Sequence, residues 1–394
     1  MGWKRWVVLL GLVFYLGLVL RGPFLSGVSA TILIVLGLAS LWNRVSTKDV
    51  IYRRKFLYTR AFPGEEFPVS IEVENRKILP LPWLRCMDPW PQAVSPRDEQ
   101  VLAPSHTKEM GYLTHVFSLL GYQRTRKIYE LVYKKRGIYQ VGPARLESGD
   151  IFGIFNNQCE AGSSTTLTVF PRMVPIPQLR MQPDNPFGDR RSRRRIYEDP
   201  NLPVGIRDYQ PQDSFRNIHW PATARIGQIQ VKVFQPSAEQ ILMLCLNIST
   251  YRRYWEGVYP ALLEHLLGMA AGLVSWGMRS GYRVGILSNG CLAQSDQPFR
   301  IPAGRSPQQL GRLLEALAGV SSVVIAPFER FLLREVPRVP YGATLLILTA
   351  VYSEELSETL LRLKKHDRQM TVISLDEQAP QVIDGVPCVH LPFH

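Results

Sequence analysis

The sequence lacks the short motifs that mark several large enzyme classes. It contains no G-x-x-x-x-G-K-[ST] phosphate loop, no H-E-x-x-H zinc motif and no G-x-S-x-G nucleophile motif. The five cysteines are scattered, odd in number and without a C-x-x-C pair, which indicates neither a zinc site nor a disulfide framework. We therefore expect a chain that is not an enzyme, with no catalytic residues, no cofactor, no metal and no small-molecule substrate.

Acidic residues are in the minority. The chain has 394 residues and a net charge of +13, with 46% apolar and 20% charged residues. This composition is typical of globular domains and leaves room for two of them plus an anchor. The positive charge favours an anionic partner, which at a membrane surface is lipid, with nucleic acid and acidic protein as alternatives.

Two apolar runs occupy the amino terminus, at residues 6–20 and 24–42, separated by Arg21, Gly22 and Pro23. Their lengths predict a transmembrane helical hairpin over residues 1–44. A signal peptide cleaved after residue 30 is the rival, but the apolar run continues through that site. Cations flank the pair at both outer ends, so we expect a multi-pass inner-membrane protein with both termini and the soluble domains in the cytoplasm. The flanking cations are Lys4, Arg5, Arg44, Lys48, Arg53, Arg54 and Lys55.

Residues 56–175 follow a period of two. Val69, Ile71 and Val73 alternate with polar residues, and turn residues bound each such stretch. The pattern predicts an antiparallel β-sandwich-like domain. Its prolines interrupt long strands, so we expect them at edges and turns; they include Pro80, Pro82, Pro89 and Pro91.

Residues 176–235 form an arginine-rich linker that ends in a distinctive stretch. The linker holds a basic run made of Arg190, Arg191, Arg193, Arg194 and Arg195. Such a run is usually a solvated loop, but it can also lie on anionic lipid headgroups or bind nucleic acid phosphates. No aromatic residues are interleaved with these arginines, which disfavours nucleic acid.

From residue 236 to residue 394, apolar strand-like runs alternate with helix-length segments. Strands are predicted at 241–248, 284–287, 345–348 and 371–375, and helices at 259–279, 307–318 and 354–366. This alternation predicts a doubly wound α/β domain with a mostly parallel sheet covered on both faces.

The stretch 205–232 concentrates arginine and aromatic side chains with one acid. Asp213 is placed to cap a short helix that begins at Ser214. Two interpretations are open: a buried ion-pair and aromatic knot that joins two domains, or a docking surface for a partner. The residues concerned are Arg207, Tyr209, Asp213, Arg216, Trp220 and Arg225.

The string R-D-Y-Q-P-Q-D-S-F-R-N-I-H-W-P-A-T-A-R at residues 207–225 resembles the signature of the family called domain of unknown function 58. Residues 135–143 and 149–155 are also similar to that family, and Gln212 stands where its signature usually has glycine. The resemblance implies a bacterial membrane protein with two spans, a β-rich region, this signature and a von Willebrand factor A-like domain. It also implies a MoxR-type AAA+ ATPase as partner.

A von Willebrand factor A-like domain often holds a divalent metal through an Asp-x-Ser-x-Ser loop after its first strand. The corresponding positions here are Asn247, Ser249 and Tyr251, and Thr349 is followed by Ala350 where an Asp commonly ends the fourth strand. Hard cations need anionic oxygen ligands. Two missing carboxylates therefore predict a degenerate site without metal.

The sequence thus predicts a membrane-anchored, non-enzymatic interaction or scaffold protein that works with a MoxR-type ATPase in protein assembly or activation. Two alternatives stay open. One is a divalent-metal-dependent adhesion module or enzyme. The other is a binder of anionic lipid, or less favourably of nucleic acid, through the run Arg190 to Arg195.

Overall fold

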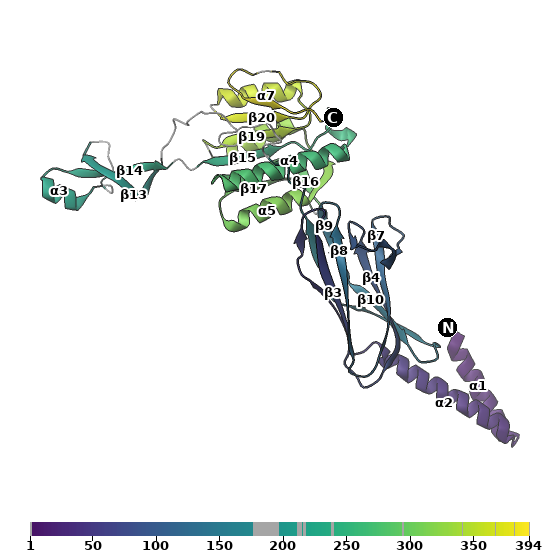
Figure 1. The fold of residues 1–394 in the computed structure, drawn as a ribbon. Helices are drawn as coiled ribbons and strands as arrows, with labels where there is room; N and C mark the ends of the chain where they lie inside the picture. Colours follow the sequence, from purple (N-terminus) through teal and green to yellow (C-terminus); the bar gives the residue numbers. More distant parts are fainter. Residues whose placement is uncertain are drawn as a thin grey trace. The chain divides into compact units, whose positions relative to one another are not determined.

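The chain forms two compact units, residues Met1–Phe170 and Pro171–His394 (Figure 1). The computed structural model describes residues 2–393 apart from 176–196, 211–214, 216–217, 238–239 and the single positions 294, 341, 367 and 382. The basic run at 190–195 therefore lies outside the described residues, as do Asp213 and Arg216.

The first unit begins with two apolar helices, α1 (Gly2–Val19) and α2 (Pro23–Ser46). With 24 residues and a mean hydropathy of 2.2, α2 is about 36 Å long, enough to cross a bilayer. Helix α4 (Pro260–Arg279) is also long and apolar enough to cross a bilayer. However, 67% of its most apolar 18-residue stretch is buried inside the protein. It is a core helix of the second unit.

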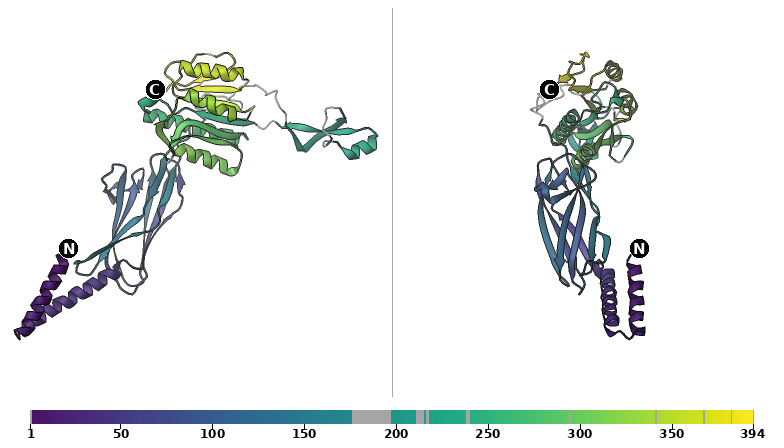
Figure 2. Two further views of the ribbon diagram at one scale, coloured as in Figure 1. Left: turned by 180° about the vertical axis from the view of Figure 1, so that it is seen from behind. Right: turned by 90° about the vertical axis from the view of Figure 1, so that its right-hand side faces the viewer.

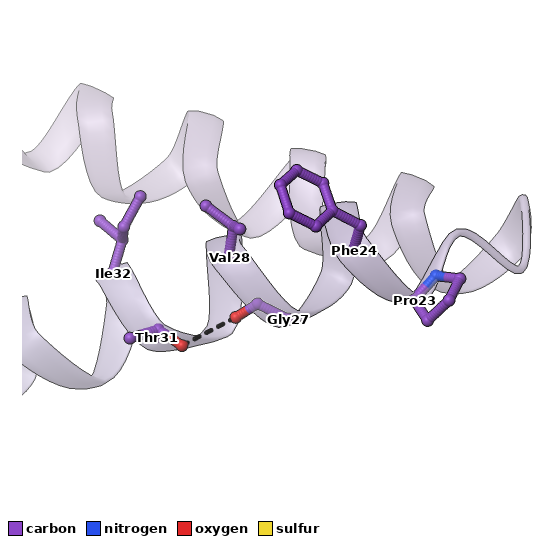
Figure 3. Close-up of a pocket in the computed structure, with 6 residues that line it drawn as sticks. All are labelled: Pro23, Phe24, Gly27, Val28, Thr31 and Ile32. Carbon is purple, nitrogen blue, oxygen red and sulfur yellow. Dashed lines mark hydrogen bonds between the residues drawn. The ribbon is translucent and has the colours of Figure 1, made fainter.

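Small residues allow α1 and α2 to approach closely near their connection. A Cβ added to Gly17 would lie 2.9 Å from the backbone nitrogen of Ser26, and Ser29 is buried. Small side chains at such contacts are typical of helices that pack within a membrane. Figure 3 shows Phe24, Val28 and Ile32 along one side of α2, with the Thr31 hydroxyl donating to the Gly27 carbonyl at 2.9 Å.

The remainder of the first unit consists of three small β-sheets, with strand orders β1-β3-β8-β5, β11-β10-β4-β7-β6 and β2-β12-β9. All strand pairs are antiparallel except β2 with β12. The predicted run of antiparallel sheets is thus confirmed. The strands are β1 (Val50–Phe56), β2 (Arg60–Ala61), β3 (Glu66–Asn75), β4 (Leu81–Pro91), β5 (Val94–Pro96), β6 (Leu102–Pro104), β7 (Met110–Leu119), β8 (Arg124–Tyr133), β9 (Gly137–Val141), β10 (Ala144–Gly149), β11 (Asn156–Ala161) and β12 (Thr165–Val169).

The prolines of β4 depart from the prediction. β4 is an inner strand, hydrogen-bonded to both β10 and β7, rather than an edge strand. However, β10 pairs only with residues 84–87 of β4, so Pro89 and Pro91 lie where β7 is the single partner. Pro82 lies at the irregularity between Leu81 and Leu84. None of these three prolines therefore lies at a position where a second neighbouring strand would accept the backbone N–H that proline lacks.

The second unit holds a sheet of seven strands in the order β17-β16-β15-β19-β20-β21, with β18 paired to β16. The pairs β15–β16, β15–β19, β19–β20 and β20–β21 are parallel, whereas β17 and β18 run antiparallel to β16. The elements are β15 (Ile241–Leu246), α4, β16 (Arg283–Leu292), β17 (Pro298–Gly304), α5 (Pro307–Ala318), β18 (Val320–Val324), α6 (Phe328–Glu335), β19 (Thr344–Thr349), α7 (Glu354–Lys365), β20 (Met370–Ser374) and β21 (Cys388–His390).

Helices cover both faces of this sheet, which Figure 2 shows from two further sides. On one face, Met243 and Cys245 of β15 join a core with Phe331 of α6 and Leu360 of α7. On the other face, a Cβ added to Gly277 of α4 would meet Leu242 of β15 at 2.9 Å. The predicted α/β alternation is therefore present, although β17, β18, α6 and β21 were not predicted.

Candidate functional site

The described part of the 205–232 stretch forms a small element of its own. Strand β13 (Tyr197–Asp208) pairs antiparallel with β14 (Gln230–Ser237), and helix α3 (Trp220–Ile226) lies between them in sequence. His219 caps α3, because its Nδ1 accepts a hydrogen bond from the backbone N–H of Ala222 at 3.1 Å. The predicted helix from Ser214, capped by Asp213, falls outside the described residues.

Gln230 holds this element together. Its side-chain amide donates to Asp208 Oδ1 at 2.6 Å, and its backbone N–H donates to the Thr223 hydroxyl at 3.0 Å. Its carbonyl accepts the backbone N–H of His219 at 2.8 Å. One buried glutamine thus links both strands to α3, which fixes the positions of the arginines and aromatic residues around it.

Six side chains of the stretch that are exposed or half-buried form what we call the signature surface, namely Arg207, Tyr209, Phe215, Trp220, Arg225 and Ile226. Phe215 and Trp220 are 73% and 67% exposed, and both arginines are exposed. The half-buried Tyr209 ring stacks on Phe215 with centroids 5.8 Å apart. The exposure of Arg207, Trp220 and Arg225 disagrees with a buried knot at these three positions.

A second group of predicted residues meets at the carboxyl ends of β15 and β19, which are parallel neighbours. The side-chain amide of Asn247 donates to the Thr349 hydroxyl at 3.0 Å, and its Oδ1 accepts the backbone N–H of Ser249 at 3.1 Å. All three residues are buried. Tyr251, by contrast, is 43% exposed.

The centre of this group is Asn289 of β16, which the sequence analysis missed. Its fully buried amide nitrogen donates to Asn247 Oδ1 at 3.0 Å and to the Ser249 hydroxyl at 3.3 Å. Its Oδ1 accepts the backbone N–H of Ile248 at 3.0 Å. A polar Ser-Asn-Gly at 288–290, following an apolar strand, was the available signal. We call Asn247, Ser249, Asn289 and Thr349 the amide network.

The amide network does not fit a divalent cation. The oxygens of Asn247 and Ser249 that could bind one already accept N–H groups of Asn289. Two carboxylates elsewhere in this unit are also engaged: Asp376 accepts the backbone N–H of Tyr352 at 2.8 Å, and Glu329 accepts the Ser353 hydroxyl at 3.2 Å. Across the described residues, no three His, Cys, Asp or Glu side chains gather as a metal site.

Comparison with known proteins gives one family match. Residues 205–338 match the model described as "Protein of unknown function DUF58". The chain is also 25% identical over 226 residues to "Uncharacterized protein YeaD" of Bacillus subtilis (strain 168), a match that covers 56% of this chain and 54% of that protein. The chain thus spans about half the length of this curated relative.

Solved structures resemble parts of the chain weakly. A CARDB domain from Pyrococcus furiosus, crystallised with di-metal ions, has a TM-score of 0.22 at 11% identity, over 31% of this chain and 92% of that one. A cohesin module from Clostridium perfringens has a TM-score of 0.22 at 11% identity, over 30% of this chain and 97% of that one. Scores this low carry no argument about function.

Proposed function

We propose that this chain, whose residues 205–338 match the DUF58 family model, is a membrane-anchored interaction protein rather than an enzyme. The observation that carries the proposal is the exposure of the signature surface. Tryptophan, tyrosine and arginine dominate the binding energy of protein interfaces. All three types occur on this surface, which a buried glutamine holds in place.

The anchor is α1 with α2. Lys4 and Arg5 lie in the first turn of α1 and further cations follow α2, whereas Arg21 alone lies in the turn between them. The excess of cations at the outer ends favours a cytoplasmic location for both termini and for the two soluble parts. The protein would then present its signature surface to the cytoplasm from the inner membrane.

The proposed partner is a MoxR-type AAA+ ATPase, as the family resemblance implies. The second unit is proposed to be a von Willebrand factor A-like domain, which the helices on both faces and the mostly parallel sheet support. The amide network supports a binding role without metal, since neutral hydrogen bonds occupy the oxygens that a cation would need. Acting with the ATPase, the protein would assemble or activate other proteins.

The test is recovery of the partner from native membranes with the full chain as bait. We expect Trp220→Ala to reduce the recovered ATPase several-fold. The matched control is Trp255→Ala, because Trp255 is 68% exposed and Trp220 67%. Arg225→Ala is compared in the same way with Arg312→Ala, both exposed. Equal recovery from all four variants, or no ATPase with the unmodified chain, would contradict the proposal.

A further inference from the structure

One end of the first unit is bonded to the last turn of α2. The ammonium group of Lys77, a buried residue, donates to the carbonyls of Ser46 and Lys48 at 2.7 and 2.6 Å. The side-chain amide of Asn157 donates to the Asn43 carbonyl at 3.3 Å and to the Thr47 hydroxyl at 2.9 Å. Since α2 is the proposed span, this end of the sandwich lies where α2 leaves the bilayer.

Three loops belong to this end: residues 76–80 and 120–123, which are joined to each other, and a third that is joined to α2. The Tyr122 N–H donates to the Lys77 carbonyl at 3.1 Å, and the Asn75 amide donates to the Leu120 carbonyl at 3.0 Å. The third loop, residues 150–155, connects β10 to β11, and both strands contact α2 (Figures 1 and 2). Two of the loops are thus bonded to each other, and the third is tied to α2 through the strands that flank it.

These loops expose large apolar side chains. The exposed fractions are 78% for Ile78, 70% for Leu120, 68% for Tyr122, 59% for Ile151, 65% for Phe152 and 47% for Ile154. Single exposed apolar residues are ordinary, but several gathered at one end indicate an interaction surface.

The 150–155 loop is held in a fixed shape. Asp150 is 1% exposed, and its carboxylate accepts the backbone N–H groups of Phe152 and Phe155 at 3.0 and 2.6 Å. Gly153 has a φ of 69°, a left-handed conformation that glycine adopts without strain. A buried acid therefore organises the turn that presents Ile151, Phe152 and Ile154 to the surroundings.

We propose that these three loops insert into the headgroup boundary of the bilayer that α2 spans. The inference rests on the proposed membrane anchor. Lipid is the occupant because the loops continue the apolar surface of α2 at its carboxyl end. Exposed cations lie in the same segments, at Arg44, Lys48 and Arg76, where they can meet anionic headgroups. Shallow insertion would fix the orientation of the sandwich on the membrane.

Spin labels on the full chain test the insertion. Cys159 and Cys388, the two cysteines that are not buried, are first replaced by serine. Single labels are then placed through Phe152→Cys and Leu120→Cys, with Leu57→Cys at the other end of β1 as the control. Ile34→Cys reports on α2 itself. The protein is reconstituted into phosphatidylcholine–phosphatidylglycerol vesicles, and label collisions with oxygen and with a water-soluble nickel chelate are compared.

We expect labels 152 and 120 to lie about 5 to 10 Å into the headgroup and acyl boundary, with an oxygen-to-nickel ratio several-fold above that of label 57. Equal ratios at 152, 120 and 57, with label 34 in lipid, overturn the insertion and leave the anchor intact. An aqueous label 34 overturns both. Labels 152 and 120 shielded from both reagents indicate a protein contact and overturn the choice of lipid.

Discussion

One buried polar group in each unit shows a different way of satisfying polar atoms in a core. In the first unit, the Arg54 guanidinium contacts Asp88 at 2.7 Å, with both side chains at most 2% exposed. The Tyr52 hydroxyl donates to the same carboxylate at 2.8 Å, and burial together with Asp88 raises the pKa of this phenol. In the second unit, the amide network contains no charged group.

The two groups should differ in how much stability is lost when one member is removed. A buried ion pair is costly to break, because removing one partner leaves the other desolvated and unpaired. A neutral network has no net charge with which to attract an ion, although each buried amide needs its partners. At this end of the sheet, the amide network therefore acts as internal packing.

The largest expected effect comes from breaking the charged group. Asp88→Ala leaves Arg54 buried without its carboxylate, and we expect the free energy of unfolding to fall by about 3 to 5 kcal/mol. Denaturant unfolding of the full chain in detergent measures this loss. The control Glu109→Ala, at an exposed position, should change stability little. A small loss for Asp88→Ala would show that the ion pair is not needed for stability.

A smaller loss is expected from the neutral network. Asn289→Ala removes the donor to Asn247 and Ser249 and leaves the Ile248 N–H without its acceptor, at a cost of about 1 to 3 kcal/mol. Unfolding of this variant is compared with that of Asn156→Ala, at an exposed position. If both substitutions cost the same, Asn289 does not organise this end of the sheet.

The pH dependence of stability tests a third buried polar group. Burial, with help from Lys127, lowers the pKa of His115 from 6.5 to about 4. Between these values the unfolded chain binds more protons than the folded one, so His115 makes stability fall as pH drops from 6.5 to 4. His115→Gln should flatten this part of the curve, whereas His106→Gln, exposed, should not. A curve unchanged by His115→Gln would contradict the assignment.

No effect at all is expected from divalent cations. Calorimetry of the full chain with magnesium or manganese should show no saturable heat, because the amide network already satisfies its oxygens. Saturable binding that Ser249→Ala abolishes would restore the metal-dependent alternative, with Ser249 as a ligand.

Local patterns predicted most of the architecture. Helix α5 occupies the expected residues 307–318, and β15, β19 and β20 lie within two residues of the expected strands. Apolar runs and their period predict these elements, because the order of apolar and polar residues along the chain reflects which face of a strand or helix is buried. The inner position of β4 was not predictable, because it depends on pairing with β10, a strand far away in sequence. That pairing stops before Pro89 and Pro91.

The candidate site was predicted less completely. The resemblance named Asn247, Ser249 and Thr349, which lie together at one end of the sheet, but Asn289 joins them only through the parallel pairing of β15 with β16. Likewise, the bonds from Gln230 to Asp208, Thr223 and His219 depend on chain reversal around α3. Such contacts link residues far apart in sequence, and no local period signals them.

The most direct test of the account is site-specific photo-cross-linking in native membranes. A photoreactive residue replaces Trp220 in one variant and Trp255, which is equally exposed, in the other. The account predicts an adduct with a AAA+ ATPase from position 220 and several-fold less from position 255. Equal adducts from both positions, or none from position 220 in cells that contain the ATPase, would contradict it.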